Sequence, residues 1–245
     1  TFTVDEHFSQ QIKREKAAWL DWGKDNYASV SFDNVPKEKR VIIGWMSNWD
    51  YAQEVPTQAW RSSMTVAREV SLKKTNDGYI LKNIPVAQLK KYQGKSTRKT
   101  IKVKAENQLI EKSQIDLSKA VVDLDLKKMT AGKYTFALKN ALGEELTFGI
   151  DNTTKELFVD RSKSGNTDFG NHFATAVSKA PLNKVYSNVK MKLVIDKTSI
   201  EIFFNDGEKV LTEIFFLNEH FSELYLSTDT KGSTLNIRGH QLNIN

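Results

Sequence analysis

The feature that most limits the fold of this chain is its succession of short apolar stretches separated by turn residues. A clear hairpin signal lies at Asn205-Asp-Gly207, between two stretches of alternating apolar residues. Asn, Asp and Gly readily adopt the positive φ that a tight hairpin turn requires. Similar signals recur at Thr75-Asn-Asp-Gly78 and Ala141-Leu-Gly143. Because no helical pattern alternates with these stretches, the chain is predicted to be all-β and antiparallel.

The first part of the chain reads as an antiparallel meander. A short helix or an irregular charged lead-in is expected over residues 5–20, and a short helix over Pro85–Lys91. The polar stretch that follows, through Lys99, is predicted to be a linker, which places a domain boundary near residue 95 and divides the chain into residues 1–95 and 96–245. The meander suits a propeller blade or a sandwich. Its strands are predicted at Tyr27–Phe32, Arg40–Met46, Ser62–Leu72 and Tyr79–Ile84.

The second part has about ten predicted strands and almost no helix, which indicates a two-sheet sandwich of jelly-roll type. The predicted strands are Ile101–Leu109, Ala120–Leu126, Gly132–Leu138, Glu145–Ile150, Glu156–Asp160, Val189–Ile195, Ser199–Phe204, Lys209–Phe216, Leu224–Ser227 and Ser233–Ile237.

Composition narrows the functional classes. Hydrophobic residues at 39% and charged residues at 27% are typical of a globular protein with a real core. The absence of cysteine excludes disulfides, zinc–thiolate sites and a cysteine nucleophile. The four histidines lie far apart and show no metal-ligand spacing, so no metal or cofactor is predicted.

The distribution of charge argues against nucleic-acid binding, and the hydropathy argues against a membrane span. The net charge of +6 comes from 36 basic and 30 acidic residues scattered along the chain, without the basic stripe of a nucleic-acid-binding protein. The lysine-rich run from Lys95 to Lys104 is predicted to be a solvated linker and edge strand. No apolar run approaches the roughly 18 residues of a membrane span. The first residues contain neither an initiator Met nor a signal peptide's apolar core, so the chain is expected to be processed, truncated or an excerpt.

All five tryptophans lie within the first sixty residues. They gather in Trp19-Leu-Asp-Trp-Gly-Lys-Asp-Asn-Tyr27, in Gly44-Trp-Met-Ser-Asn-Trp-Asp-Tyr51 and at Trp60. Indole rings stack on sugar rings, and nearby Asp and Asn side chains bind hydroxyl groups, so this composition fits a carbohydrate subsite. The same aromatics also suit the packing between propeller blades, and composition alone leaves both interpretations open.

Several segments resemble those of the glycoside hydrolase family 32 levanases, inulinases and invertases, in the same order and at similar spacing. The resemblance is strongest through residue 72 and more diffuse in the later part. The segments are Asp21-Trp-Gly-Lys-Asp-Asn-Tyr-Ala28, Gly44-Trp-Met-Ser-Asn-Trp49, Val55-Pro-Thr57, Trp60-Arg-Ser62, Met64-Thr-Val-Ala-Arg-Glu69, Leu157-Phe-Val-Asp-Arg-Ser162 and Val194–Gly207.

The resemblance implies the last blades of a five-bladed β-propeller followed by a jelly-roll-like β-sandwich, from an enzyme that hydrolyses fructans (levan or inulin) or sucrose with retention of configuration. The family's catalytic carboxylates lie in segments that contain Asp-Pro or Glu-Cys. No proline of this chain follows an aspartate and cysteine is absent, so no catalytic residue is assigned here. The resemblance implies that the N-terminal blades of the same protein are the partner of this chain. The extracellular nature of fructans favours a secreted or periplasmic location. The alternative is a non-catalytic carbohydrate-binding or structural module.

The resemblance also implies four substrate-binding residues, Asp25, Tyr27, Trp45 and Trp49, and the position of Asp50 next to Trp49 adds a fifth. For Asp25 the alternative is a carboxylate satisfied within the protein, and for Trp45 it is packing in the core. Trp49 and Asp50 follow the predicted strand in a loop, where functional residues concentrate.

Two further charged pairs have the residue types of an acid/base pair but are expected to serve turns and ion pairs at strand ends. They are Asp160 with Arg161 and Asp206 with Glu208.

Overall fold

The computed structural model describes residues 19–76, 78–104, 106–112, 114–170 and 172–244. Strands dominate this part of the chain, which confirms the all-β prediction. The lead-in expected over residues 5–20 lies almost entirely outside the described residues. None of the described helical segments has the length and apolarity needed to cross a membrane.

The N-terminal sheet, built from residues 27–85, is antiparallel and has the strand order β1-β2-β4-β5, with β3 paired to β2. The predicted turn at residues 75–78 joins β4 to β5, and Gly78 has a φ of 113°, which favours glycine. The strands are β1 (Tyr27–Ser31), β2 (Val41–Met46), β3 (Ser63–Met64), β4 (Arg68–Thr75) and β5 (Gly78–Pro85).

A 3₁₀ helix, η1 (Ala87–Tyr92), connects this sheet to the rest of the molecule, where a short helix was expected. The linker predicted to follow it is wrong, because residues 93–102 form strand β6 (Gln93–Lys102). A polar sequence is compatible with this strand because β6 lies at a sheet edge and pairs only with β17 (Thr234–Leu242). Strand β6 runs across the predicted boundary near residue 95.

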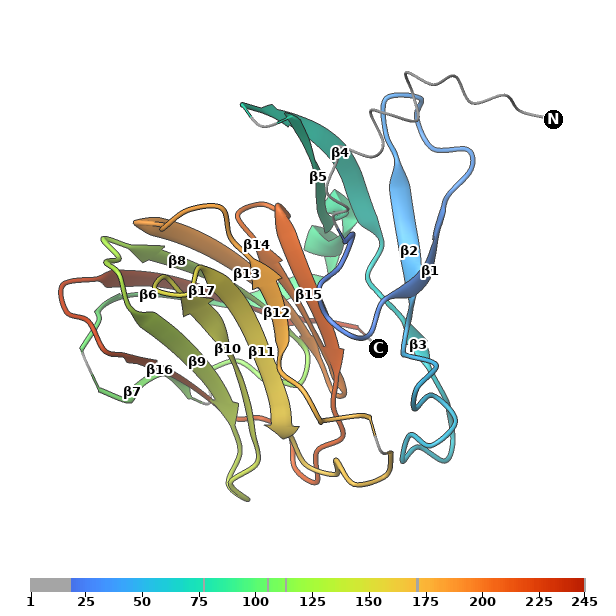
Figure 1. Cartoon of the computed structure of the whole chain (residues 1–245). Coiled ribbons are helices and arrows are strands. Elements are labelled where there is room, and N and C mark those ends of the chain that lie inside the picture. Colours follow the sequence, from blue (N-terminus) through green and yellow to red (C-terminus); the bar gives the residue numbers. More distant parts are fainter. Residues whose placement is uncertain (1–18, 77, 105, 113, 171, 245) are drawn as a thin grey trace.

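The remaining strands form a β-sandwich of two six-stranded sheets (Figure 1). One sheet has the order β12-β11-β10-β9-β16-β7 and the other β15-β14-β13-β8-β17-β6. Strand β12 was not predicted from the sequence, whereas the edge strand predicted within Lys95–Lys104 corresponds to most of β6. The strands not yet given are β7 (Gln108–Lys112), β8 (Ala120–Lys127), β9 (Lys133–Lys139), β10 (Glu145–Asp151), β11 (Glu156–Lys163), β12 (Ser178–Pro181), β13 (Asn188–Asp196), β14 (Ser199–Phe204), β15 (Lys209–Ile214) and β16 (Glu223–Thr228).

The core lies between these two sheets. Alternating side chains of the strands point inward, and Phe136 and Phe148 stack there with ring centroids 5.3 Å apart. Each fully buried large apolar side chain contributes about 1.5–3 kcal/mol of transfer free energy. The predicted hairpin at Asn205–Gly207 joins β14 to β15, and all three residues have positive φ.

The sandwich sheet ends at β15, and the segment before β1 covers this edge. Trp22 N donates to Val210 O at 2.7 Å, and Asp25 N donates to Thr212 O at 3.1 Å. Gly23 lies so close that an added Cβ would stand 2.1 Å from the Thr212 carbonyl oxygen. Glycine is therefore required between two aspartates that dock on β15, and the covered edge is protected from pairing with another chain.

Candidate functional site

Three of the predicted site residues form a cluster of rings, which we call the aromatic wall: Tyr27, Trp45 and Trp49. Tyr27 on β1 lies opposite Trp45 on β2, with ring centroids 6.1 Å apart in an edge-to-face arrangement. Trp45 and Trp49 approach to 5.0 Å. Tyr27 is 53% exposed and Trp49 64% exposed, whereas Trp45 is half-buried between them. Exposed rings held by one another offer a rigid apolar surface on which a sugar ring can stack.

The loop after β2 fixes Trp49 and the fourth predicted residue, Asp50. Asn48 Nδ2 donates to the carbonyl oxygen of Lys24 at 3.1 Å. Asn48 Oδ1 accepts from the backbone N of Asp50 at 3.0 Å, and the Asp50 side chain is exposed. Asp50 is thus an available acceptor for hydroxyl groups next to Trp49.

Asp25, the fifth predicted residue, lies in the interior with a fully buried side chain. Its carboxylate accepts from the Tyr51 hydroxyl at 2.5 Å, from Arg161 Nη1 at 2.5 Å and from Ile214 N at 2.9 Å. This geometry favours the alternative of a carboxylate satisfied within the protein. Its partners lie on the sandwich and on the loop after β2.

Arg161 holds a second carboxylate beside Asp25. Its Nη1 lies 3.0 Å from Glu213 Oε2, and the Glu213 side chain is 1% exposed. Burial raises the pKa of Glu213 to about 7, because Arg161 offsets the cost of desolvation only in part and Asp25 adds repulsion. Burial also raises the pKa of Tyr51, and Asp25 raises it further.

The guanidinium of Arg161 stays charged. Burial lowers its pKa, but Asp25 and Glu213 outweigh that effect and raise it overall. Arg161 Nε also donates to the carbonyl oxygen of Phe173 at 2.9 Å. The sequence reasoning correctly assigned Arg161 to ion pairs, but its expectation of a solvated one is wrong.

A second buried ion cluster surrounds Arg68 of β4. Its guanidinium contacts Asp21 at 2.8 Å and Glu201 at 2.6 Å, and all three side chains are at most 3% exposed. Arg68 Nη2 donates to Thr212 Oγ1 at 2.7 Å. Burial raises the pKa of Asp21, but Arg68 and Thr212 outweigh it and lower that pKa overall. For Glu201 burial dominates and the pKa is raised.

The two clusters join the N-terminal sheet to strands β11, β14 and β15 of the sandwich. Lys24 N donates to Glu213 Oε1 at 3.2 Å, and the Lys24 carbonyl in turn holds Asn48. The sandwich therefore positions the loop that carries Trp49 and Asp50. The ion cluster of Tyr51 and Glu213 could not be predicted from the sequence, because their partners lie far away along the chain.

The site suits sugar contact, and the two buried carboxylates beside it do not form an accessible acid/base pair. Asp25 and Glu213 lie near one another, but neither side chain is more than 1% exposed and a substrate cannot reach them. Trp60 is 46% exposed and makes no ring contact with the aromatic wall in the described structure. Among the residues that the structure describes, no three His, Asp or Glu side chains gather in a metal-binding arrangement.

A β-sandwich docked to an antiparallel sheet with exposed tryptophans defines a two-part, all-β protein of the carbohydrate-active kind. Comparison with known families agrees at both ends of the chain. Residues 86–241 match the model described as "Glycosyl hydrolases family 32 C terminal", and residues 1–84 match "Glycosyl hydrolases family 32 N-terminal domain". The chain belongs to glycoside hydrolase family 32.

Individual relatives agree with this assignment. The levanase of Bacillus subtilis (strain 168) is 35% identical over 213 residues, which cover 85% of this chain and 31% of the levanase. The extracellular exo-inulinase of Aspergillus niger is 30% identical over 232 residues, which cover 91% of this chain and 42% of the inulinase. The crystal structure of exo-inulinase from Aspergillus awamori matches with a TM-score of 0.80 at 28% identity, over 93% of this chain and 45% of that chain. The chain thus spans less than half the length of these relatives.

Proposed function

We propose that this chain is the C-terminal part of a retaining β-fructosidase that hydrolyses fructans such as levan or inulin, or sucrose. The observation that carries the proposal is the aromatic wall of Tyr27, Trp45 and Trp49, which is exposed on the N-terminal sheet. The relatives of this chain include a levanase and exo-inulinases. In this proposal the wall stacks on a fructosyl ring and Asp50 accepts from its hydroxyl groups. Asp25 positions the wall from beneath and does not touch substrate.

The chemistry itself belongs to a pair of carboxylates outside this chain. In retaining hydrolysis one carboxylate attacks the anomeric carbon while the second protonates the departing oxygen, and water then releases the sugar. We propose that the N-terminal sheet forms the last part of a five-bladed propeller, whose other blades carry these carboxylates. The exposed faces of β1 and β5 support this arrangement, because they leave apolar side chains such as Val30, Tyr79 and Leu81 without cover in the chain described.

Fructose release by the full-length parent protein tests the proposal. The parent should release fructose from levan, inulin or sucrose, and this 245-residue chain alone should not. In the parent, Trp49→Ala should lower kcat/KM about tenfold through lost stacking. Trp19→Ala is the matched control, because Trp19 is 73% exposed and lies outside the aromatic wall. A parent without fructosidase activity would overturn the proposal and favour a sugar-binding module.

A further inference from the structure

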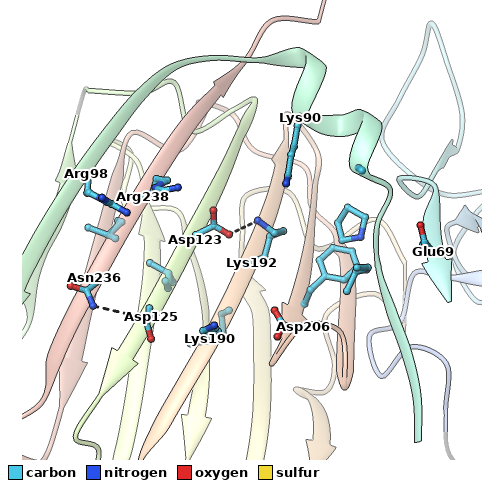
Figure 2. Close-up of a pocket in the computed structure, with 17 residues that line it drawn as sticks. Glu69, Lys90, Arg98, Asp123, Asp125, Lys190, Lys192, Asp206, Asn236 and Arg238 are labelled. Atoms are coloured by element: carbon cyan, nitrogen blue, oxygen red, sulfur yellow. Dashed lines mark hydrogen bonds and ion pairs between the residues drawn. The ribbon is translucent and has the colours of Figure 1, made fainter. Parts of the chain in front are cut away.

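A groove of about 590 Å³ lies on the sandwich, away from the aromatic wall. Its floor is the outer face of the sheet that contains β6, β17, β8 and β13, and η1 with the end of β5 forms one side (Figure 2). This volume lies within the range of about 300–1,000 Å³ that small-molecule sites occupy. The volume of the groove is larger than a single inorganic ion would occupy.

Two arginines stand side by side on this floor. Arg98 of β6 lies directly opposite Arg238 of β17 in the strand register, and both are exposed. Side chains opposite one another in an antiparallel pair have Cβ atoms about 5 Å apart, and like charges there destabilise the pair. Within the described structure neither arginine has an ion-pair partner. The repulsion therefore persists unless a bound anion offsets it.

The carboxylate beside Arg238 already has an ion-pair partner. Asp123 of β8 lies next to Arg238 in register, but it forms an ion pair with Lys192 of β13. Lys90 points from η1 into the groove and, among the residues described, also has no ion-pair partner (Figure 2). This end of the groove thus has three cationic side chains that no carboxylate of the described structure neutralises.

The other end of the floor carries hydrogen-bonding groups around Asn236, with charges of both signs from Asp125 and Lys190 (Figure 2). Asn236 Nδ2 donates to Asp125 Oδ2 at 3.4 Å, and Thr100 Oγ1 donates to Asn236 Oδ1 at 2.8 Å. Carboxylate, amide and hydroxyl groups of this kind bind sugar hydroxyls, each of which both donates and accepts. A fitting ligand has an anionic group at one end and hydroxyl groups at the other.

We propose that this groove binds a sugar that bears a phosphate or a carboxylate, with the anionic group between Arg98 and Arg238 and the hydroxyls toward Asn236 and Asp125. A guanidinium binds either anion through two parallel hydrogen bonds, and two guanidiniums together enclose it. Lys90 adds a third positive charge from above. The site is separate from the aromatic wall and independent of the hydrolytic function.

Calorimetric titration of the 245-residue chain at low salt tests this site. The ligands are fructose 6-phosphate, glucuronate, inorganic phosphate and neutral fructose. We expect fructose 6-phosphate or glucuronate to bind more tightly than both inorganic phosphate and fructose, and the stronger of the two identifies the anion. The double variant Arg98→Gln/Arg238→Gln should weaken that binding at least tenfold, and Lys90→Gln about threefold.

The control Lys163→Gln/Lys231→Gln also removes two positive charges, from exposed positions that do not line the groove. It should bind as the unmodified chain does, and none of the variants should lower the thermal midpoint, since removing the two arginines also removes their repulsion. An equal loss in the control would overturn the proposal, because the effect would then be that of net charge. Equal binding of inorganic phosphate or of fructose, or no binding of either sugar anion, would overturn it as well.

Discussion

The N-terminal sheet and the sandwich are stabilised in different ways. All six residues of β14 in the sandwich are buried, whereas four of the five residues of β1 in the N-terminal sheet are exposed. The main core cluster of the described structure consists of sandwich residues from Val103 onward. The apolar residues that the N-terminal region does bury, including Met46, Tyr51 and Val55, pack against Phe173 and Phe216 of the sandwich.

The N-terminal region also contributes three charged side chains to the interior. Asp21, Asp25 and Arg68 are buried there, and each pairs with a charged or polar group of the sandwich. Buried charges contribute little net stability as complete sets, but they are costly when one partner is missing. The sandwich therefore depends on its own core, while the N-terminal sheet depends on the surface to which it docks.

The largest expected effect follows from separating the two regions. Residues 86–245 expressed alone should fold cooperatively, because the core between the two sheets stays complete. Residues 1–85 alone should not, because the buried charges and the small apolar cluster lose their partners and the exposed edges invite association. Circular dichroism during thermal unfolding, together with sedimentation, measures both. A monomeric and cooperatively folded 1–85 fragment would show that this comparison is wrong.

The next largest effect is expected from Arg68→Met. The substitution leaves the carboxylates of Asp21 and Glu201 buried without their shared cation, which costs about 3–5 kcal/mol of unfolding free energy. Chemical denaturation followed by tryptophan fluorescence reports it, since all five tryptophans lie in the first sixty residues.

The double variant Arg68→Met/Glu201→Gln serves as the matched control for this prediction. It removes one of the two uncompensated charges and should recover part of the lost stability. Equal stability of the Arg68→Met variant and the unmodified chain would mean that the docking does not depend on this cluster.

A smaller effect is expected from pH, through Glu213. Burial raises its pKa from the usual 4.5 to about 7, so between these values the folded chain binds a proton that the unfolded chain releases. The free energy of unfolding should therefore fall by about 1–3 kcal/mol as the pH rises through this window. The raised pKa of Glu201 acts in the same direction above pH 4.5, whereas the lowered pKa of Asp21 acts below pH 3.8.

Glu213→Gln isolates this contribution. Unfolding by denaturant at several pH values should show a shallower decline for the variant than for the unmodified chain between pH 4.5 and 7. Arg161, Asp25, Lys24 and Ser178 surround the carboxyl group and remain in both proteins. Identical slopes in the two proteins would assign the pH dependence to another group.

Sequence reasoning predicted the repetitive part of this molecule well. Alternating apolar residues and the hairpin at Asn205–Gly207 indicate strands because each signal is local. It was only partly right at β6, interpreted as a linker and edge strand, because the pairing with β17 is a long-range contact that the local sequence does not contain.

In the candidate site, too, the local features were predicted and the long-range contacts were not. Tyr27, Trp45 and Trp49 were identified because aromatic residues in family-like segments are visible in the sequence, and the structure brings their rings together. The burial of Asp25 was considered only as an alternative, since it depends on Arg161, which is 136 residues away along the chain. The Asp-x-Gly-x-Asp spacing has a physical reason that only the structure shows, namely the close approach of Gly23 to Thr212.

The smallest effect is expected from an exposed ion pair that joins the same two regions. Lys73 of β4 lies 2.6 Å from Glu208, in the turn before β15, and the lysine side chain is 50% exposed. Solvent screens this attraction, and holding two long side chains together costs entropy. Lys73→Met should therefore leave the denaturation midpoint unchanged within error. If it lowered the midpoint as much as Arg68→Met does, exposed and buried charges would contribute alike. The stability of the docked N-terminal sheet would then depend on the number of charge pairs across the boundary. It would not depend on whether these pairs are buried.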